Sequence, residues 1–345
     1  MSSVRHGRRT SIGVAWAIAM TGCGGSVPVA SEAGTIPTVS VRPASSAPSS
    51  TPAASQVPLP ALELLWEASG PTQPTPCCQT WWPAIDPKSG NVWVANSFAS
   101  EYWIFKPDGA FVEAWGKPGS GDGEFNFRSH RAKPQATGAI AFAPDGSFFV
   151  ADDGNRRVVK FSADRKLLSQ WGGFGAGDGK FAEPFGIATD GHAVYVADDD
   201  RGDIQAFDLD GQFVRTFGSI TTQAGIFIAV DAAGNLYRSG EEPATVAKYD
   251  SSGQLLGRVD VGPADGIVVG LAFGSSGHLF AAVHFDERSR QEIVELDASG
   301  RELHRWAAAG ETVVVDPSGD AIYVASDGHD GWPTASLRKY ALPGD

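Results

Sequence analysis

Short runs in which apolar and polar residues alternate recur along the chain from about residue 60 onward. Between residues 139 and 172, four such runs follow one another, and turn residues separate each run from the next. A period of two is the pattern of a β-strand with one buried face, and four consecutive short strands make one blade of a β-propeller. This stretch therefore predicts a four-stranded antiparallel blade.

The same pattern occurs six times, and each copy has a glycine directly before its second run. These glycines are Gly90, Gly146, Gly191, Gly234, Gly277 and Gly319. Their spacings of 56, 45, 43, 43 and 42 residues are typical of a propeller or a solenoid. The sixth copy has only three runs, and residues 62–66 match the missing fourth run. We therefore expect an all-β, six-bladed β-propeller over residues 59–345, in which the N-terminal strand closes the last blade and leaves no open sheet edge.

The turn between the third and fourth strands is an Asp-Gly or Ser-Gly pair in four copies, as hairpins favour, whereas Arg165 replaces the glycine in the second copy. A large apolar residue ends the fourth strand in five copies: Trp115, Trp171, Phe217, Val259 and Trp306. We interpret these residues as packing positions between neighbouring blades rather than as contacts to a cofactor.

The first 58 residues have a different composition. Residues 1–22 combine a basic start with an apolar run shorter than the roughly 20 residues that span a bilayer, which predicts a signal peptide. The segment resembles a lipoprotein signal, which implies lipidation of Cys23; an ordinary secretory signal is the alternative. Residues 23–58 are rich in Ser, Ala and Pro and predict a disordered tether. We therefore expect an exported protein, lipid-anchored to the outer face of a bacterial membrane in the cell envelope.

The charge balance is acidic, with 27 Lys and Arg residues against 40 Asp and Glu residues and a formal net charge of −13. Binding to nucleic acid draws most of its affinity from clustered basic residues, so we expect no nucleic-acid partner. We expect the protein to be a monomer.

The second and third copies resemble the NHL repeat. The resemblance rests on Gly175-Ala-Gly-Asp-Gly-Lys-Phe181, Glu183-Pro-Phe-Gly-Ile-Ala-Thr-Asp-Gly191, Val194-Tyr-Val-Ala-Asp198 and Ile204-Gln-Ala-Phe-Asp-Leu-Asp-Gly211. The NHL family includes sensor domains of bacterial receptor kinases, scaffold domains and an enzyme, peptidyl-α-hydroxyglycine α-amidating lyase. Related six-bladed propellers include gluconolactonases and a streptogramin-opening lyase. Because this fold occurs in both binding modules and enzymes, the fold alone does not indicate which of these functions the protein has.

Polar residues stand where the second strand of a blade ends. In a propeller these ends lie at one rim of the central channel, where the inner strands begin. The residues are Asn96, Asp152, Asp198, His284 and, just beyond a strand end, Asp327. Side chains of this kind hold Ca²⁺, Mg²⁺ or Zn²⁺, and Asp152, Asp198 and His284 are the candidate ligands for a divalent cation. The alternative is that the two aspartates are structural and accept turn hydrogen bonds from their own loops.

The resemblance to the amidating lyase implies a zinc ion held by histidines just before the glycines that open the inner strands. The corresponding positions here are Trp82, Thr137, Phe185, Ile226, Val269 and, approximately, Glu311. None is histidine, so a three-histidine zinc site is not expected. A site in which carboxylates hold one divalent ion, as in gluconolactonases, stays an open alternative. We interpret Trp82 and Phe185 as an apolar floor of the rim.

The segment that leads into the second blade is eight residues longer than its counterpart in the third blade, and it contains Arg128, His130 and Arg131. A basic loop on an acidic protein suits an anionic ligand such as a carboxylate, a phosphate or an acidic glycan, and a solvated loop explains it equally well. The adjacent Cys77 and Cys78 stand in the segment that enters the first blade. Thiols of an exported protein rarely stay free, so we expect a vicinal disulfide or an intermolecular bond.

These features favour a ligand- or protein-binding module at the channel rim, with a cell-envelope protein, a glycan or a small anionic ligand as its partner. The alternative is a metal-dependent hydrolase or lyase, gluconolactonase-like or amidating-lyase-like. An enzyme of that kind requires a divalent cation, whereas a binding module does not.

Overall fold

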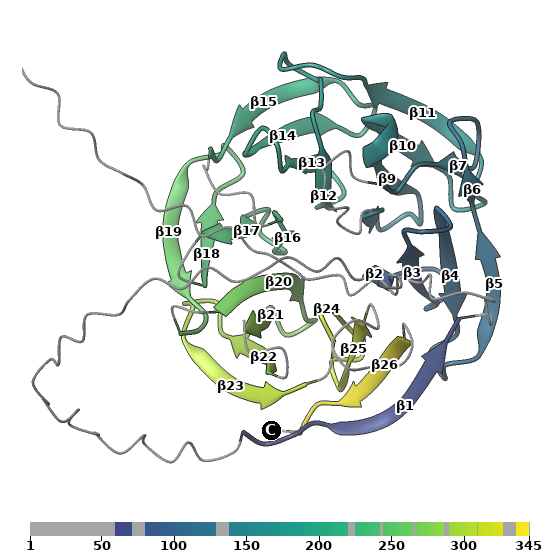
Figure 1. Cartoon of the computed structure of the whole chain (residues 1–345). Coiled ribbons are helices and arrows are strands. Elements are labelled where there is room, and N and C mark those ends of the chain that lie inside the picture. The colour runs from purple at the N-terminus through teal and green to yellow at the C-terminus, as the bar shows by residue number, and fades with distance from the viewer. Residues whose placement is uncertain are drawn as a thin grey trace, which may run out of the picture. The chain divides into compact units, whose positions relative to one another are not determined.

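The computed structural model describes residues 59–70, 80–128, 138–219, 225–241, 244–263, 266–285, 290–308, 310–326 and 336–344. Within these residues the chain forms six four-stranded antiparallel sheets, arranged as blades around a common axis (Figure 1). The expectation of an all-β, six-bladed propeller is therefore confirmed. Among the described residues the helical structure is one 3-10 turn, Asp153–Asn155, and no helix there is long and apolar enough to cross a membrane.

Each blade runs from an inner strand at the axis to an outer strand at the perimeter. Blade 1 contains β2 (Thr80–Ile85), β3 (Val92–Asn96), β4 (Glu101–Phe105) and β5 (Phe111–Trp115). Blade 2 contains β8 (Ile140–Phe142), β9 (Phe148–Asp152), β10 (Arg157–Phe161) and β11 (Leu167–Gly172). Blade 3 contains β12 (Pro184–Thr189), β13 (Ala193–Asp198), β14 (Asp203–Asp208) and β15 (Phe213–Phe217).

The remaining blades follow in chain order. Blade 4 contains β16 (Ile228–Val230), β17 (Leu236–Glu241), β18 (Thr245–Tyr249) and β19 (Leu255–Asp260). Blade 5 contains β20 (Gly266–Phe273), β21 (Leu279–Phe285), β22 (Gln291–Leu296) and β23 (Glu302–Ala307). Blade 6 contains β24 (Thr312–Val315), β25 (Ala321–Ser326), β26 (Ser336–Ala341) and β1 (Glu63–Ser69). A short parallel ribbon, β6 (Lys117–Pro118) with β7 (Glu124–Phe125), lies between β5 and β8 in the chain.

Two strand ends differ from the pattern seen in the sequence. The second strand of blade 4 continues past Ser239 to Glu241, and that of blade 5 continues past His284 to Phe285.

The N-terminal strand closes the ring, as the match of residues 62–66 predicts. β1 pairs antiparallel with β26 from Glu63 opposite Ala341 to Ser69 opposite Ser336. Trp66 on β1 packs against Tyr323 with ring centroids 5.8 Å apart, and its indole Nε1 donates a hydrogen bond to the Pro107 carbonyl of blade 1 at 3.2 Å. The closing strand therefore binds both the blade that it completes and the next one.

Large residues at the outer-strand ends pack between blades, as expected. Trp171 lies over the turn of blade 3, where a Cβ on Gly211 would come within 2.4 Å of the indole. Phe217 lies in the same way over Gly253 of blade 4, at 2.8 Å. Both glycines also have a positive φ, which residues with a Cβ adopt at a cost. Glycine at this turn thus serves the turn conformation and the close contact between blades.

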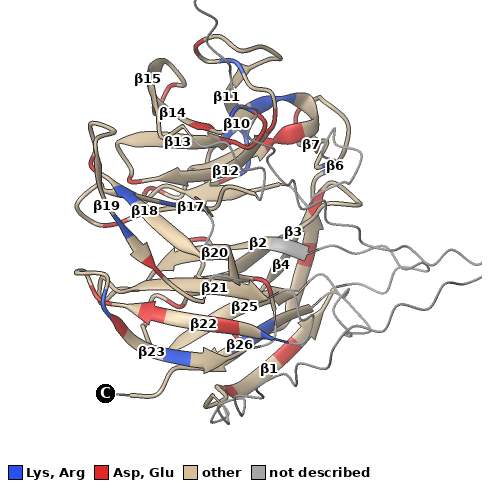
Figure 2. Cartoon of the chain, turned by 60° about the vertical axis from the view of Figure 1, so that its left-hand side comes forward, with Lys and Arg blue, Asp and Glu red and all other residues tan. Residues whose placement is uncertain are grey.

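The distribution of charge separates the inner from the outer strands. None of the six inner strands contains Lys, Arg, Asp or Glu, and β12 and β20 are entirely tan in Figure 2. The two outer strands of a blade carry ion pairs, such as Arg305 on β23 with Glu292 on β22 of blade 5, at 2.6 Å. Charge next to the inner strands therefore comes from the second strands, as with Arg238 of β17 and Asp152 of β9, and from the loops beside them.

Candidate functional site at the rim

One end of the ring collects the starts of the inner strands and the ends of the second strands, because the two are antiparallel neighbours. Thr80 at the start of β2 is paired with Asn96 at the end of β3, and Pro184 at the start of β12 is paired with Asp198 at the end of β13. We call this end of the propeller the rim. The strand-end residues identified in the sequence lie there, as far as the structure describes them.

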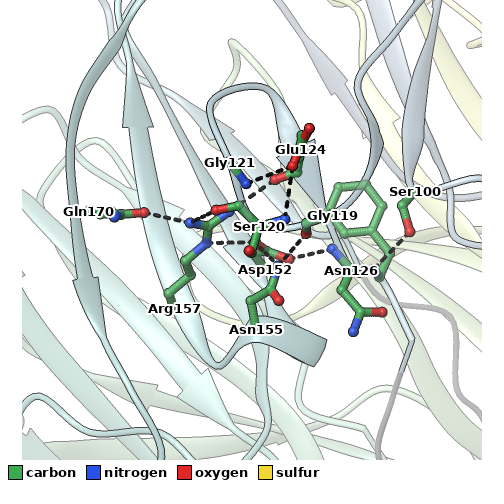
Figure 3. Close-up of polar contacts among 11 residues, drawn as sticks. Ser100, Gly119, Ser120, Gly121, Glu124, Asn126, Asp152, Asn155, Arg157 and Gln170 are labelled. Atoms are coloured by element: carbon green, nitrogen blue, oxygen red, sulfur yellow. Dashed lines mark hydrogen bonds and ion pairs between the residues drawn. The ribbon is translucent and has the colours of Figure 1, made fainter.

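Asp152 at the end of β9 is fully buried and accepts hydrogen bonds at both carboxylate oxygens (Figure 3). Its Oδ1 accepts from the Asn126 backbone N–H at 2.7 Å, and its Oδ2 accepts from Asn155 Nδ2 at 2.8 Å and Arg157 Nε at 2.7 Å. Burial raises the pKa of the Asp152 carboxyl, and these hydrogen bonds lower it, with burial the larger effect. The protein itself therefore satisfies this carboxylate.

The same network holds the ribbon of β6 and β7 against blade 2. The guanidinium of Arg157 donates to the carbonyls of Ser120 and Glu124 at 2.7 and 2.9 Å, and to Gln170 Oε1 at 2.5 Å. Asn155 adds a hydrogen bond to the Gly119 carbonyl at 2.8 Å. Asp152 thus orients an arginine and an asparagine that fasten the preceding loop.

Asp198 at the end of β13 repeats this arrangement in blade 3. It is fully buried and accepts from the backbone N–H groups of Ala182, Glu183 and Arg201 at 2.7, 3.0 and 3.0 Å. Burial is the largest effect on its pKa and raises it, whereas the three backbone donors lower it. The contacts of both aspartates fit the structural alternative that the sequence left open.

The other predicted residues at the rim are more scattered. Asn96 is buried and donates from Nδ2 to Glu101 Oε1 at 3.3 Å. His284 is half-buried on β21, in register with Ile267 and Gln291, and Arg128 is exposed. Cys23, Cys77, Cys78, His130, Arg131 and Asp327 lie outside the described residues. Within the described part of the chain, no group of three or more His, Cys, Asp or Glu residues is placed to hold a metal ion.

Three aromatic side chains from different blades meet at the rim. Trp82 of β2 stacks on Phe227 with ring centroids 4.7 Å apart and meets Phe185 of β12 edge-on at 5.2 Å. Phe185 and Phe227 are buried, whereas Trp82 is half-buried and covers them. We call Trp82, Phe185 and Phe227 the aromatic cluster.

Trp82 has an unusual backbone and an unusual side-chain environment. Its φ is +56°, in the left-handed region, and the register of β2 with β3 shifts between Trp81 and Ala84. The indole Nε1 of Trp82 is buried and has no hydrogen-bond acceptor among the described residues. Strained backbone of this kind in a bulky residue persists only where the surroundings hold it, and it concentrates at functional sites.

Phe227 was not identified from the sequence. In blade 4 it follows Ile226, which aligns with Trp82 and Phe185, so it stands where blade 3 has Gly186. A Cβ on Gly186 would come within 2.4 Å of the Ile226 carbonyl, and no side chain fits there. In the sequence, the sign of this difference is that blade 4 has Phe227 where blade 3 has Gly186.

Asp153 directly follows Asp152, the last residue of β9. It is fully buried, and within the described part of the chain neither of its carboxyl oxygens has a hydrogen-bond partner. Burial and the nearby carboxylates of Glu183 and Asp198 raise the pKa of Asp153 to about 9. The rim therefore combines an unsatisfied buried carboxyl in blade 2 with the aromatic cluster of blades 1, 3 and 4.

No protein-family model and no curated protein sequence matches this chain. Solved structures match it at sequence identities of 10–16%. The WD40 repeats of RRP9 superpose with a TM-score of 0.56 at 10% identity, over 83% of this chain and 100% of that one. A protein of unknown function from Bacteroides thetaiotaomicron gives a TM-score of 0.56 at 16% identity, over 79% and 72%.

A third similar structure is an enzyme. The catalytically inactive virginiamycin B lyase from Staphylococcus aureus, solved with quinupristin, gives a TM-score of 0.53 at 11% identity, over 79% of this chain and 98% of the lyase. At such identities the similarity shows the propeller fold alone. The fold is compatible with a binding module and with a lyase-like propeller.

Proposed function

We propose that this protein is an exported, lipid-anchored propeller with NHL-like repeats that binds a ligand or a partner protein at its rim. Lipidation at Cys23 and the tether of residues 23–58 would hold the propeller outside the membrane that carries the anchor. The repeats in blades 2 and 3 support the assignment to NHL-like propellers, and the similar structures support the fold.

The observation that carries the binding proposal is the aromatic cluster with Trp82 at its surface. A half-buried tryptophan over two buried phenylalanines offers a rigid apolar face, and its buried indole N–H has no acceptor among the residues that the structure describes. Aromatic residues with a polar tip are enriched at the centres of binding sites. The left-handed backbone of Trp82 adds a conformational cost that its surroundings must hold in place.

Binding at the rim is tested with immobilised full-length protein and solubilised cell-envelope material. Trp82→Ala is expected to lose most of the specifically bound material, whereas Leu168→Ala, a change at a 54% exposed position on outer strand β11, is expected to retain it. Thermal unfolding of both variants checks that the propeller is intact. Equal retention by a folded Trp82→Ala variant would place the binding surface elsewhere.

The alternative is a metal-dependent hydrolase or lyase that uses the same rim. Its requirement is a divalent ion held by side chains such as Asp152, Asp198 or His284. Metal content of the purified protein, measured by mass spectrometry before and after dialysis against a chelator, separates the two functions. Near-stoichiometric Ca, Mg or Zn that His284→Ala removes favours the enzyme, and metal-free protein that still binds envelope material favours the binding module.

A further inference from the structure

The aromatic cluster lies across the axis of the ring. Trp82 belongs to blade 1, and the ring on which it stacks, Phe227, directly precedes the inner strand of blade 4. In a ring of six, blades 1 and 4 face each other, as β2 and β16 do in Figure 1. Trp82 also meets Phe185 edge-on and packs against the buried residues of blades 2 and 3 that include Ala151 and Ile187. The indole therefore covers the axis at the rim.

Three features oppose this conformation of Trp82. Its φ of +56° lies in the left-handed region, which lowers the population of an L-residue by roughly five- to thirtyfold. The next residue is Pro83, and a residue before proline favours an extended backbone with a φ of about −120°. The indole N–H is buried with no acceptor among the described residues, which adds a third cost. An extended backbone that places the indole in water would remove all three.

The backbone around Trp82 leaves room for this change. The register of β2 with β3 shifts between Trp81 and Ala84, which places Trp82 and Pro83 in a bulge between two paired segments. Residues in a bulge are not held by the ladder of hydrogen bonds on either side. The backbone can therefore rotate at Trp82 while β2 stays paired with β3.

Phe185 and Phe227 hold the indole in place. Their ring centroids lie 5.2 and 4.7 Å from that of Trp82, and both rings are buried. Each such contact between aromatic rings stabilises a conformation by roughly two- to tenfold beyond the burial of area. These contacts are of the same order as the costs of the left-handed backbone. The observed conformation of Trp82 and an extended one therefore lie close in free energy.

We propose that Trp82 is a two-state gate at the rim. In the closed state, which the structure shows, the indole lies on Phe185 and Phe227 and completes the apolar face of the rim. In the open state the backbone of Trp82 is extended and the indole leaves the axis, so this face is absent. The inference concerns the regulation of the proposed binding function and rests on it, because a ligand that binds the closed face shifts Trp82 toward the closed state.

The test measures hydrogen exchange of the Trp82 indole N–H by NMR in the full-length protein. That N–H is buried in the closed state and reaches water in the open one, so its exchange rate follows the open fraction. The indole Nε1 atoms of Trp93 and Trp171 are also buried without an acceptor among the described residues, and they serve as internal controls. Replacement of each tryptophan with phenylalanine assigns its signal.

Two variants are expected to shift the gate in opposite directions. Pro83→Ala removes the preference for an extended backbone and is expected to slow exchange at Trp82 by at least about twofold. Phe227→Leu keeps an apolar side chain but loses the contact between rings, and it is expected to speed exchange at Trp82 by roughly two- to tenfold. Neither variant is expected to change the rates of the two control tryptophans.

Pro107→Ala, in the exposed turn between β4 and β5, is the matched control for the loss of a proline and is expected to leave exchange at Trp82 unchanged. The proposal is overturned if Pro83→Ala fails to slow this exchange or if Phe227→Leu fails to speed it. A change of the same size at the control tryptophans also overturns it, because the variants then act on the stability of the whole ring. Circular dichroism of each variant confirms that it is folded.

The link to binding has its own readout. Retention of envelope material is expected to follow the closed state, so Pro83→Ala retains at least as much as the wild type and Phe227→Leu retains less. The reverse order overturns the closed state as the one that binds.

The outcome is separable from that of the proposed function, because the exchange rates are measured without a ligand. Rates at Trp82 that do not respond to the variants overturn the gate and leave a rigid binding face in place. A folded Trp82→Ala variant that retains the envelope material contradicts the proposed function itself, whatever the exchange rates are.

Discussion

At the scale of single residues, two non-glycine residues in the left-handed region illustrate different uses of the same conformation. Arg165 has φ +62° in the turn where other blades have glycine, and Trp82 has φ +56° at the rim. The guanidinium of Arg165 lies 5.9 Å from the centre of the Trp115 ring and 2.8 Å from Glu113 Oε1. Arg165 thus replaces the close glycine contact by covering the neighbouring tryptophan with its side chain.

Replacing Arg165 with glycine tests whether its side-chain contacts offset the cost of its left-handed backbone. Glycine relieves a left-handed conformation that costs an L-residue roughly 1 kcal/mol, whereas the half-exposed contacts of Arg165 contribute about 1 kcal/mol or less. We expect Arg165→Gly to change the free energy of unfolding by less than about 1 kcal/mol, and Arg165→Ala to lower it by about 1 kcal/mol, because alanine keeps the conformational cost and loses the contacts. Urea denaturation of the three proteins measures both changes. A large loss in the glycine variant would mean that the side-chain contacts dominate.

Asp153 predicts a dependence of stability on pH. The pKa of its carboxyl is about 9 in the folded protein against an ordinary 3.8, so the folded state holds a proton that the unfolded state releases. Stability from this group is complete below about pH 4 and falls as the pH rises toward 9, by up to about 1.4 kcal/mol per pH unit. Glu183, Asp198 and Asp152 strengthen the effect, and Arg156 opposes it.

The measurement is urea denaturation of the wild type and of Asp153→Asn at pH 5, 6, 7 and 8. The asparagine variant cannot titrate here, so its free energy of unfolding is expected to fall less steeply than that of the wild type over this range. Parallel slopes for the two proteins would show that Asp153 is ionised in the fold.

At the scale of elements, the ends of the second strands hold the loops that connect the blades. Asp152 is the centre of such a connection, since Asn126, Asn155 and Arg157 all donate to it. Asp198 does the same in blade 3 through backbone donors. Each carboxylate therefore fastens the loop that leads into its own blade.

Removing the Asp152 carboxylate is expected to destabilise the protein by about 3–5 kcal/mol, because Arg157 is then left mostly buried without its counter-charge. Asp122→Ala, at an exposed position in the loop between β6 and β7, is the matched control and is expected to change stability by about 0.5 kcal/mol or less. Thermal unfolding of Asp152→Ala and Asp122→Ala compares the two. Equal effects would show that the network around Asp152 contributes little.

The sequence predicted the blades well, because each blade is built from local alternation and from turn residues that repeat at a fixed period. It identified Asp152 and Asp198 but left their role open, since hydrogen bonds to a carboxylate depend on how a loop folds back. The importance of Asp153 and Phe227 was not predicted. Packing between blades that lie far apart in the chain decides whether a buried carboxyl has a hydrogen-bond donor. The same packing decides whether an aromatic ring contacts rings of other blades.

At the scale of the whole molecule, the predicted lipid anchor has a direct test. Cys23→Ser removes the thiol that lipidation requires. The variant is expected to appear in the soluble extracytoplasmic fraction and to lose incorporation of labelled palmitate, while its circular dichroism stays that of a β-protein. Fractionation and labelling of cells that express either form measure this. Unchanged labelling in the variant would refute lipidation at Cys23.

The closure of blade 6 joins the two ends of the described chain in one sheet, and its strength depends on Trp66. Trp66→Ala removes the packing on Tyr323 and the hydrogen bond to Pro107, and we expect it to destabilise the protein by about 2–3 kcal/mol. Leu65→Ala, at a position that is 49% exposed on the same strand, is expected to be nearly neutral. Calorimetric melting of both variants tests whether the closing strand stabilises the whole ring.

This closure also determines how the propeller responds to mechanical tension. A pull on the chain ahead of β1 acts first where Pro60 and Ala61 meet Ala307 of blade 5, and then on the end of β1 where Glu63 is opposite Ala341. Antiparallel pairs loaded from one end break one hydrogen bond after another, so β1 peels from β26 while the strands of the other blades stay paired. Tension therefore opens the ring at one defined seam, and release of the tension lets the same strand pair again.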